Sequence, residues 1–200
     1  MAYPCNEVEQ STCFQTTEYN MQKIFFTIGL CCLSYFSMAQ KYTPSDSESK
    51  VQFVIKNFGL KVDGQLKGIK GSISFDPSEL NNSNFNVSVN ANTINTDNTA
   101  RDKHLKKADY FHVEQFPLIS FVSTKITQRT TAGQYKVAGN LTIKGTTKAI
   151  EFDFTANPTS KGYQFKGAFT INRRDFKVGG SSLPLSDNLT VELDITALKN

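Results

Sequence analysis

The residue types that most often carry chemistry gather in residues 101–114. Asp102, His104 and His112 lie there, and carboxylate and imidazole side chains bind divalent metals and transfer protons. The two histidines are eight positions apart, however, so they do not share one turn of a helix. A surface or helix-capping role is the favoured interpretation of the three side chains. A metal-dependent or hydrolytic enzyme centred on them stays open as an alternative.

Motifs of the common enzyme classes are missing from the sequence. It has no Gly-x-Ser-x-Gly turn, no glycine-rich phosphate loop and no His-Glu-x-x-His pair. All four cysteines (Cys5, Cys13, Cys31 and Cys32) precede residue 33, so the remaining chain has no thiol for catalysis or zinc binding. We therefore expect no catalytic residue, no metal and no cofactor. The formal net charge of +4 is too small to indicate a nucleic-acid partner.

The first 39 residues resemble a targeting segment. Lys23 is followed by an apolar run over 24–36 and by a small-x-small end at 37–39, which is the order found in secretory signal peptides. The run is shorter than the roughly 20 residues of a membrane-spanning helix. We predict a signal peptide at 21–39, cleaved after Ala39, and a periplasmic or secreted protein without stable membrane insertion. Residues 1–20 are predicted to be a mis-called start or an extended n-region.

Alternating apolar and polar residues dominate the rest of the chain. Val51, Phe53 and Ile55, for example, alternate with lysine and glutamine, which is typical of a strand with one buried and one wet face. The same period predicts nine strand segments, at about 50–56, 60–67, 69–75, 85–91, 118–126, 137–143, 150–154, 163–171 and 191–196. It also predicts a bulge between Phe121 and Val122. These strands indicate an all-β sandwich or a closed barrel over 48–200, preceded by an N-terminal tail at 40–47.

One segment breaks this alternation. Residues 99–107 predict a short helix between two strands, and Thr99 and Asp102 stand at the spacing of a capping box. A short helix at that point would act as a lid or plug for one end of a barrel.

Three glycines occupy apolar positions of their strands. Gly71, Gly139 and Gly167 each stand between large apolar residues. Taken singly, each is best explained by the coiling that closes a barrel. Taken together, they fit a barrel with some interior space.

Several motifs resemble those of a known family. They are Arg-Asp-x-His-Leu at 101–105, continuing through Asp-Tyr-Phe to Phe-Pro-Leu-Ile-Ser-Phe at 116–121; Gly-Asn-Leu-Thr-Ile-Lys-Gly-Thr-Thr-Lys at 139–148; Ile-Asn-Arg-Arg-Asp-Phe at 171–176; and Gly-x-x-Gly-x-Ile-x-Phe-Asp at 68–76. In these motifs, and over about residues 48–198, the chain resembles the YceI-like family of polyisoprenoid- or lipid-binding proteins. Two positions depart from the family pattern: Lys56-Asn57 stands where members often have a histidine, and Phe176-Lys177 replaces the usual Phe-Gly.

The resemblance implies a fold and a function. The implied fold is an extended, lipocalin-like antiparallel β-barrel of about eight strands, with a short helix inserted between strands. The implied function is that of an exported bacterial carrier, which holds a polyisoprenoid or related fatty amphiphile inside the barrel. A structural barrel module with no ligand stays open as an alternative, as does a homodimer.

Candidate ligand-binding residues follow from the apolar face of each strand. The candidates for the cavity lining are Phe53, Ile55, Ile73, Phe75, Val87, Val89, Phe121, Leu141, Phe152, Phe154, Phe165, Phe169 and Leu193. Arg101 and His104, on the predicted helix, are the candidates for contact with a polar or phosphorylated head group at the mouth. Alternation alone does not distinguish a hollow barrel from a packed one.

Overall fold

The computed structural model describes residues 40–200. The predicted signal peptide, the alternative start sites and all four cysteines lie outside the described residues. The elements of the described part are β1 (Lys41–Pro44), η1 (Asp46–Glu48), β2 (Lys50–Asn57), β3 (Leu60–Ser74), η2 (Leu80–Asn82), β4 (Asn84–Asn95), α2 (Thr99–Leu105), β5 (Leu118–Gln128), β6 (Gln134–Ile143), β7 (Thr146–Thr159), β8 (Gly162–Asn172), η3 (Arg173–Phe176) and β9 (Leu185–Lys199), where η marks a 3-10 helix. No helix within residues 40–200 is long and apolar enough to cross a bilayer.

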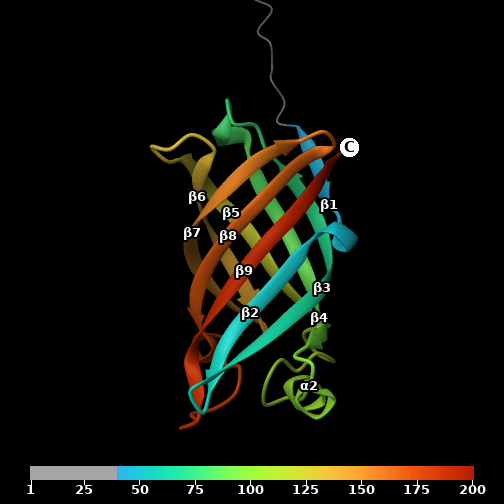
Figure 1. The fold of residues 1–200 in the computed structure, drawn as a ribbon, viewed down its shortest axis with the longest axis vertical. Helices are drawn as coiled ribbons and strands as arrows, with labels where there is room; N and C mark the ends of the chain where they lie inside the picture. Colours follow the sequence, from blue (N-terminus) through green and yellow to red (C-terminus); the bar gives the residue numbers. More distant parts are fainter. Residues whose placement is uncertain (1–39) are drawn as a thin grey trace, which may run out of the picture. The chain divides into compact units, whose positions relative to one another are not determined.

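Strands β2 to β9 form a closed antiparallel barrel (Figure 1). Each strand pairs with the next one along the chain, and β9 pairs back onto β2, where Phe53 lies opposite Val191. Successive side chains therefore alternate between the interior and the outer surface, as the sequence pattern required. The predicted all-β fold, a lipocalin-like barrel of eight strands with a short helix between strands, is confirmed.

The expected N-terminal tail is partly a strand. Residues 41–44 form β1, which pairs with the end of β3, with Tyr42 opposite Ile73, and with the end of β9, with Pro44 opposite Ala197. This strand lies where β2 would continue, so it completes the barrel wall at that end. Side-chain alternation does not reveal this strand, because four residues ending in proline offer only two inward positions.

A carboxylate of η1 holds a bend in β3. Asp46 Oδ1 accepts hydrogen bonds from the amides of Gly68 and Ile69, at 2.6 and 2.8 Å. Gly68 has a φ of +76°, and the β3–β4 register shifts on both sides of Lys67. The two strand segments predicted at 60–67 and 69–75 are therefore one bent strand, because the irregularity at Gly68 is accommodated within the sheet.

The bulge in β5 lies two residues beyond its predicted place. Phe121 and Val122 pair regularly with Leu141 and Asn140, and the shift in register comes between Ser123 and Lys125. The inward face therefore passes from Phe121 to Ile126, which is 4% exposed. The break in alternation was real, and the prediction of its position was wrong.

The predicted capping box at α2 is also wrong. The helix is capped by Asn98, whose side chain accepts a hydrogen bond from the amide of Arg101 at 3.0 Å. Asp102 instead accepts from the amide and the hydroxyl of Thr96, at 3.0 and 2.6 Å. Asparagine is as good a cap as threonine or better, and here it stands one position earlier.

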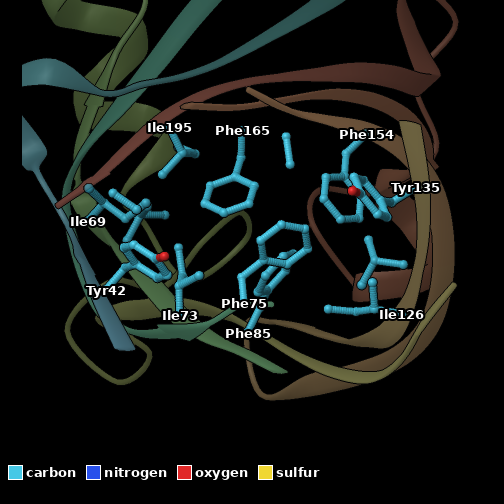
Figure 2. Close-up of a cluster of buried hydrophobic side chains, with 14 residues drawn as sticks. Tyr42, Ile69, Ile73, Phe75, Phe85, Ile126, Tyr135, Phe154, Phe165 and Ile195 are labelled. Carbon is cyan, nitrogen blue, oxygen red and sulfur yellow. The ribbon is translucent and has the colours of Figure 1, made fainter. Parts of the chain in front are cut away.

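Seven aromatic rings fill the barrel at the end opposite α2, near the β3–β4, β5–β6 and β7–β8 turns; Figure 2 shows most of them. Phe75 is 1% exposed and lies at their centre, with its ring centroid 5.2 Å from that of Tyr135 and 5.3 Å from that of Phe165, both edge to face. We call this cluster the aromatic plug; it comprises Tyr42, Phe75, Phe85, Tyr135, Phe154, Tyr163 and Phe165. One half of the barrel is therefore filled.

Candidate functional site

The half of the barrel toward α2 holds a cavity of about 170 Å³. Twenty of its 24 lining residues are apolar: Val51, Phe53, Leu66, Ile69, Val87, Val89, Phe111, Ile119, Phe121, Leu141, Ile143, Phe152, Phe169, Ile171, Phe176, Val178, Leu189, Val191, Leu193 and Ile195, with Gln52, Ser88, Ser120 and Arg173 as the polar four. A cavity of similar size with such a lining stays dry and accepts small apolar molecules. The site is therefore suited to hydrocarbon.

Eight of the 13 predicted lining residues lie at this cavity. They are Phe53, Val87, Val89, Phe121, Leu141, Phe152, Phe169 and Leu193. Contact between these side chains and a ligand stays a prediction.

The other five predicted residues are not among the residues that line this cavity, and their contact with a ligand stays a prediction. Phe75, Phe154 and Phe165 belong to the aromatic plug, and Ile73 is 4% exposed in the same core cluster. Ile55 lies toward the β2–β3 turn, where it pairs with Val62 and Leu189. All five have the predicted inward parity. Ile73, Phe75, Phe154 and Phe165 lie at the depth of the plug, and alternation carries no information about depth.

The connection from β8 to β9 forms part of the cavity wall. Phe176 and Val178, which are 2% and 6% exposed, line the cavity and pack with Phe111 from the segment after α2. Both segments therefore contribute to the cavity wall at the end of the barrel toward α2. The sequence-based list missed these residues because it was drawn from strands alone, and all three lie outside strands.

A buried arginine holds this connection in place. Arg173, 3% exposed, donates to the carbonyls of Val178 and Gly180 at 2.9 Å, to that of Ser186 at 3.0 Å and to that of Leu185 at 3.4 Å. It also forms a 2.9 Å ion pair with Asp187. With its donors engaged in this way, the guanidinium is committed to the protein. The inward position of Arg173 could have been predicted from the sequence, since Arg173 continues the alternation in which Phe169 and Ile171 point inward.

Arg101 and His104, the predicted head-group residues, are not among the residues that line the cavity. Arg101 donates to the hydroxyl of Thr96 at 2.7 Å and to its carbonyl at 2.6 Å, which ties α2 to the end of β4. His104 is exposed and packs edge to face on Tyr110, with ring centroids 4.9 Å apart. Both residues therefore lie outside the hydrocarbon site, and contact with a head group beyond it stays a prediction.

The three residues of the alternative enzyme hypothesis have separate partners. Asp102 binds Thr96, His104 packs on Tyr110, and His112 packs on Phe116 with ring centroids 5.8 Å apart. In the described part of the chain, no group of three or more His, Cys, Asp or Glu side chains is placed to hold a metal ion. The geometry therefore gives this hypothesis no direct support.

One of the inward glycines is explained by a neighbouring ring. A Cβ on Gly139 would come within 2.5 Å of Phe121 Cζ and 2.6 Å of the carbonyl oxygen of Val122. The space left by the missing side chain is therefore occupied by Phe121, which itself lines the cavity. This glycine admits a large aromatic residue to the wall and does not itself create empty space.

Comparison with known proteins places the chain among characterised folds. A solved structure of BcnA from Burkholderia cenocepacia superposes with a TM-score of 0.72 at 22% identity, covering 76% of this chain and 98% of that one. The YceI protein of Campylobacter jejuni superposes with a TM-score of 0.62 at 28% identity, covering 70% and 86%. A polyisoprenoid-binding domain from Saccharophagus degradans superposes with a TM-score of 0.65 at 12% identity, covering 82% and 100%.

Sequence comparison agrees with these folds. A UPF0312 protein of Pseudomonas syringae pv. tomato is 36% identical over 153 residues, which cover 73% of this chain and 78% of that protein. A UPF0312 protein of Yersinia enterocolitica is 27% identical over 191 residues, covering 90% and 98%. The model of the YceI-like domain matches residues 42–197, a range that begins within β1 and ends near the end of β9. The chain therefore belongs to the YceI-like family.

Proposed function

We propose that this protein is an exported, non-catalytic carrier that holds the hydrocarbon chain of a polyisoprenoid or a related amphiphile in its barrel. The observation that carries the proposal is the cavity beside the aromatic plug, which twenty apolar residues line. The polyisoprenoid-binding domain of Saccharophagus degradans, which shares this fold, is consistent with the proposal.

The chemistry of the cavity limits what it can hold. Burial of hydrocarbon is favourable by roughly 0.8 kcal/mol per methylene. A charged head group in the same space would need a partner, and Arg173 is already engaged by four carbonyls and Asp187. We therefore place the hydrocarbon inside and the head group outside, at the end of the barrel toward α2, where Arg101 and His104 are its candidate partners.

Native mass spectrometry of protein purified from its own host tests the proposal. We expect additional mass that corresponds to a bound amphiphile and disappears after extraction with organic solvent. Titration of the extracted protein with a long-chain isoprenoid alcohol or a fatty acid should restore it. An empty barrel that takes up neither compound would contradict the carrier function and favour a structural module.

The enzyme hypothesis is tested by removing its histidines. A His104→Ala, His112→Ala double variant should retain full uptake of hydrocarbon, because neither side chain lines the cavity. Loss of a metal-dependent activity in that variant, with an unchanged fold, would favour the enzyme instead.

Export rests on the predicted signal peptide at 21–39. N-terminal sequencing of the mature protein should find Gln40 as the first residue, directly before β1. A mature protein that begins at Met1 would contradict this cleavage site.

A further inference from the structure

Three large apolar side chains are exposed at the β2–β3 turn and at the connection into β9, at the end of the barrel that carries α2. Phe58 is 78% exposed, Leu60 is 73% exposed and Leu183 is fully exposed. Phe58 and Leu60 belong to the tip of the β2–β3 hairpin, and Leu183 belongs to the connection that leads into β9. Contiguous exposed apolar groups on a soluble domain commonly mark a site of contact with a protein or a membrane.

The hairpin tip and the connection are joined. The amide of Phe58 donates to the carbonyl of Pro184 at 2.7 Å, and Asn57 pairs with Leu60 on one side and Leu185 on the other. Figure 1 shows the β2–β3 turn beside the segment that enters β9, at the same end of the barrel as α2. We call Phe58, Leu60 and Leu183 the apolar tip.

The sequence of the apolar tip is poorly suited to the backbone conformation of its turn. Phe58 and Gly59 form a two-residue turn with φ values of +51° and +78°. Such turns strongly favour Asn-Gly or Asp-Gly, because both positions need a left-handed backbone. A bulky aromatic residue at the first position is strained, and exposure of its ring to water adds a further cost. A phenylalanine that is unfavourable here for both the backbone and solvation indicates a use for an apolar side chain.

The charges beside the tip are also unfavourable within the free protein. Lys56 pairs directly with Lys61 across the hairpin, and both are exposed. Like charges in directly opposed positions destabilise a sheet, and an anionic partner would turn this repulsion into attraction. Apart from the ion pair of Arg173 and Asp187, residues 56–61 and 173–187 together carry four basic side chains and one acidic side chain. The surroundings of the tip are therefore basic.

We propose that the apolar tip and its lysines dock on an anionic lipid bilayer, with Phe58, Leu60 and Leu183 inserted among the lipid chains. Apolar side chains with lysines beside them are an arrangement by which peripheral proteins bind anionic membranes. A second copy of the chain fits less well, since a two-fold contact through this patch would bring basic surfaces together. That this docking loads the cavity with membrane lipid rests on the proposed function; the docking itself rests on the exposed residues alone.

Flotation with vesicles tests the docking, and one variant separates it from folding. The purified protein should float with vesicles of mixed phosphatidylcholine and phosphatidylglycerol, and float much less with phosphatidylcholine alone. Phe58→Asn creates the favoured Asn-Gly turn, so it should keep or raise thermal stability while weakening vesicle binding about ten-fold. Leu183→Ser should weaken binding in the same direction.

Matched controls identify the contribution of each feature. Val122 is 43% exposed on the outer wall of β5, away from the tip, so Val122→Ser should leave vesicle binding unchanged. A Lys56→Gln, Lys61→Gln double variant should bind anionic vesicles about ten-fold less and become insensitive to the negative lipid. Added salt should weaken binding of the unaltered protein.

The outcomes separate the docking from the carrier function. Equal flotation of Phe58→Asn and the unaltered protein would overturn the docking, as would a dimer in vesicle-free solution that Phe58→Asn abolishes. Protein that contains co-purified amphiphile but does not bind vesicles would refute the docking without contradicting the carrier function. Protein that binds vesicles but never takes up hydrocarbon would refute the carrier function and leave the docking standing.

Discussion

Arg173 and Asp187 form an ion pair of 2.9 Å that joins the beginning of η3 to the beginning of β9. The arginine is 3% exposed, and Asp187 also lies 3.5 Å from the more exposed Arg174. Since the same guanidinium binds the carbonyls of Val178 and Gly180, it fixes the connection that carries Phe176 to the cavity. Arg173 thus positions part of the wall of an apolar cavity, while its own hydrogen-bond donors are engaged by the protein and not by a ligand.

Replacement of Arg173 by methionine should be severely destabilising. It leaves four backbone carbonyls without this donor, and each buried acceptor left unsatisfied costs about 1–3 kcal/mol. Asp187 adds less to the loss, because its side chain is 39% exposed and it keeps Arg174 at 3.5 Å. Urea unfolding would measure the loss. Arg174→Gln is the matched control: its guanidinium is 49% exposed, so the change should be below about 1 kcal/mol. Equal effects of the two substitutions would contradict the anchoring role.

Lys177→Gly should stabilise the protein. Lys177 ends η3 with a φ of +58°, in the left-handed region that glycine adopts without a steric penalty. We expect a gain of about 1 kcal/mol in the free energy of unfolding. Lys148→Gly, in the extended backbone of β7, should have the opposite sign, because glycine weakens a strand. A loss of stability at both positions would contradict this explanation.

The two halves of the barrel should respond differently when an inward side chain is made larger. Val191→Phe projects a ring into the cavity, so it should cost less than about 1 kcal/mol and sharply reduce uptake of a fluorescent long-chain fatty acid. Val137 is fully buried in the core cluster of the plug, so Val137→Phe should cost about 1–3 kcal/mol through overpacking. Thermal unfolding and ligand titration of both variants would check this, and equal destabilisation would contradict a hollow half.

Alkaline pH should destabilise the aromatic plug. Burial raises the pKa of Tyr42 and Tyr135 above the ordinary value of 10.0; the nearby Tyr163 adds to both shifts, and Asp76 adds to that of Tyr42. The folded protein therefore holds these protons more tightly than the unfolded chain. Their contribution is fully present below about pH 10 and is lost as pH rises from there through the folded-state pKa values.

A double variant isolates this effect. Tyr42→Phe together with Tyr135→Phe removes both titrating groups and keeps the rings, which are each only 5% exposed. Urea midpoints of the two proteins should be close at neutral pH, and the variant should lose less stability above about pH 10. Parallel declines in the two proteins would assign the alkaline effect to other groups.

The fold followed from the sequence because the strand period is read directly from side-chain alternation. Val51, Phe53 and Ile55 share a face in the structure as they do in the pattern. The errors in the helix cap and in the bulge arose because neighbouring positions in the sequence satisfy the same structural requirement. A cap at Asn98 or Thr99 satisfies α2 almost equally, and a bulge at 121 or 124 restores the same inward face.

The site was harder to predict than the fold for a geometric reason. Phe152 and Phe154 are neighbours on the inward face of β7, yet Phe152 lines the cavity and Phe154 belongs to the plug. The difference between the two positions is that rings from distant strands pack around Phe154 at its depth along the barrel axis, whereas they do not fill the space beside Phe152. Tyr42 from β1 and Phe75 from the end of β3 meet at one depth only after the barrel closes, so no local pattern contains that information.

In the proposed carrier, the aromatic plug would fix the direction in which a hydrocarbon chain lies. Since Phe75 and the rings around it block the far half of the barrel, a chain that enters from the α2 end cannot be threaded through. It has to be inserted with its hydrocarbon terminus leading and withdrawn in the reverse order, so the last part to enter is the first to leave. In the proposed carrier, an acceptor would therefore always meet the same end of the amphiphile, and the plugged barrel would set the orientation of its ligand as well as its solubility.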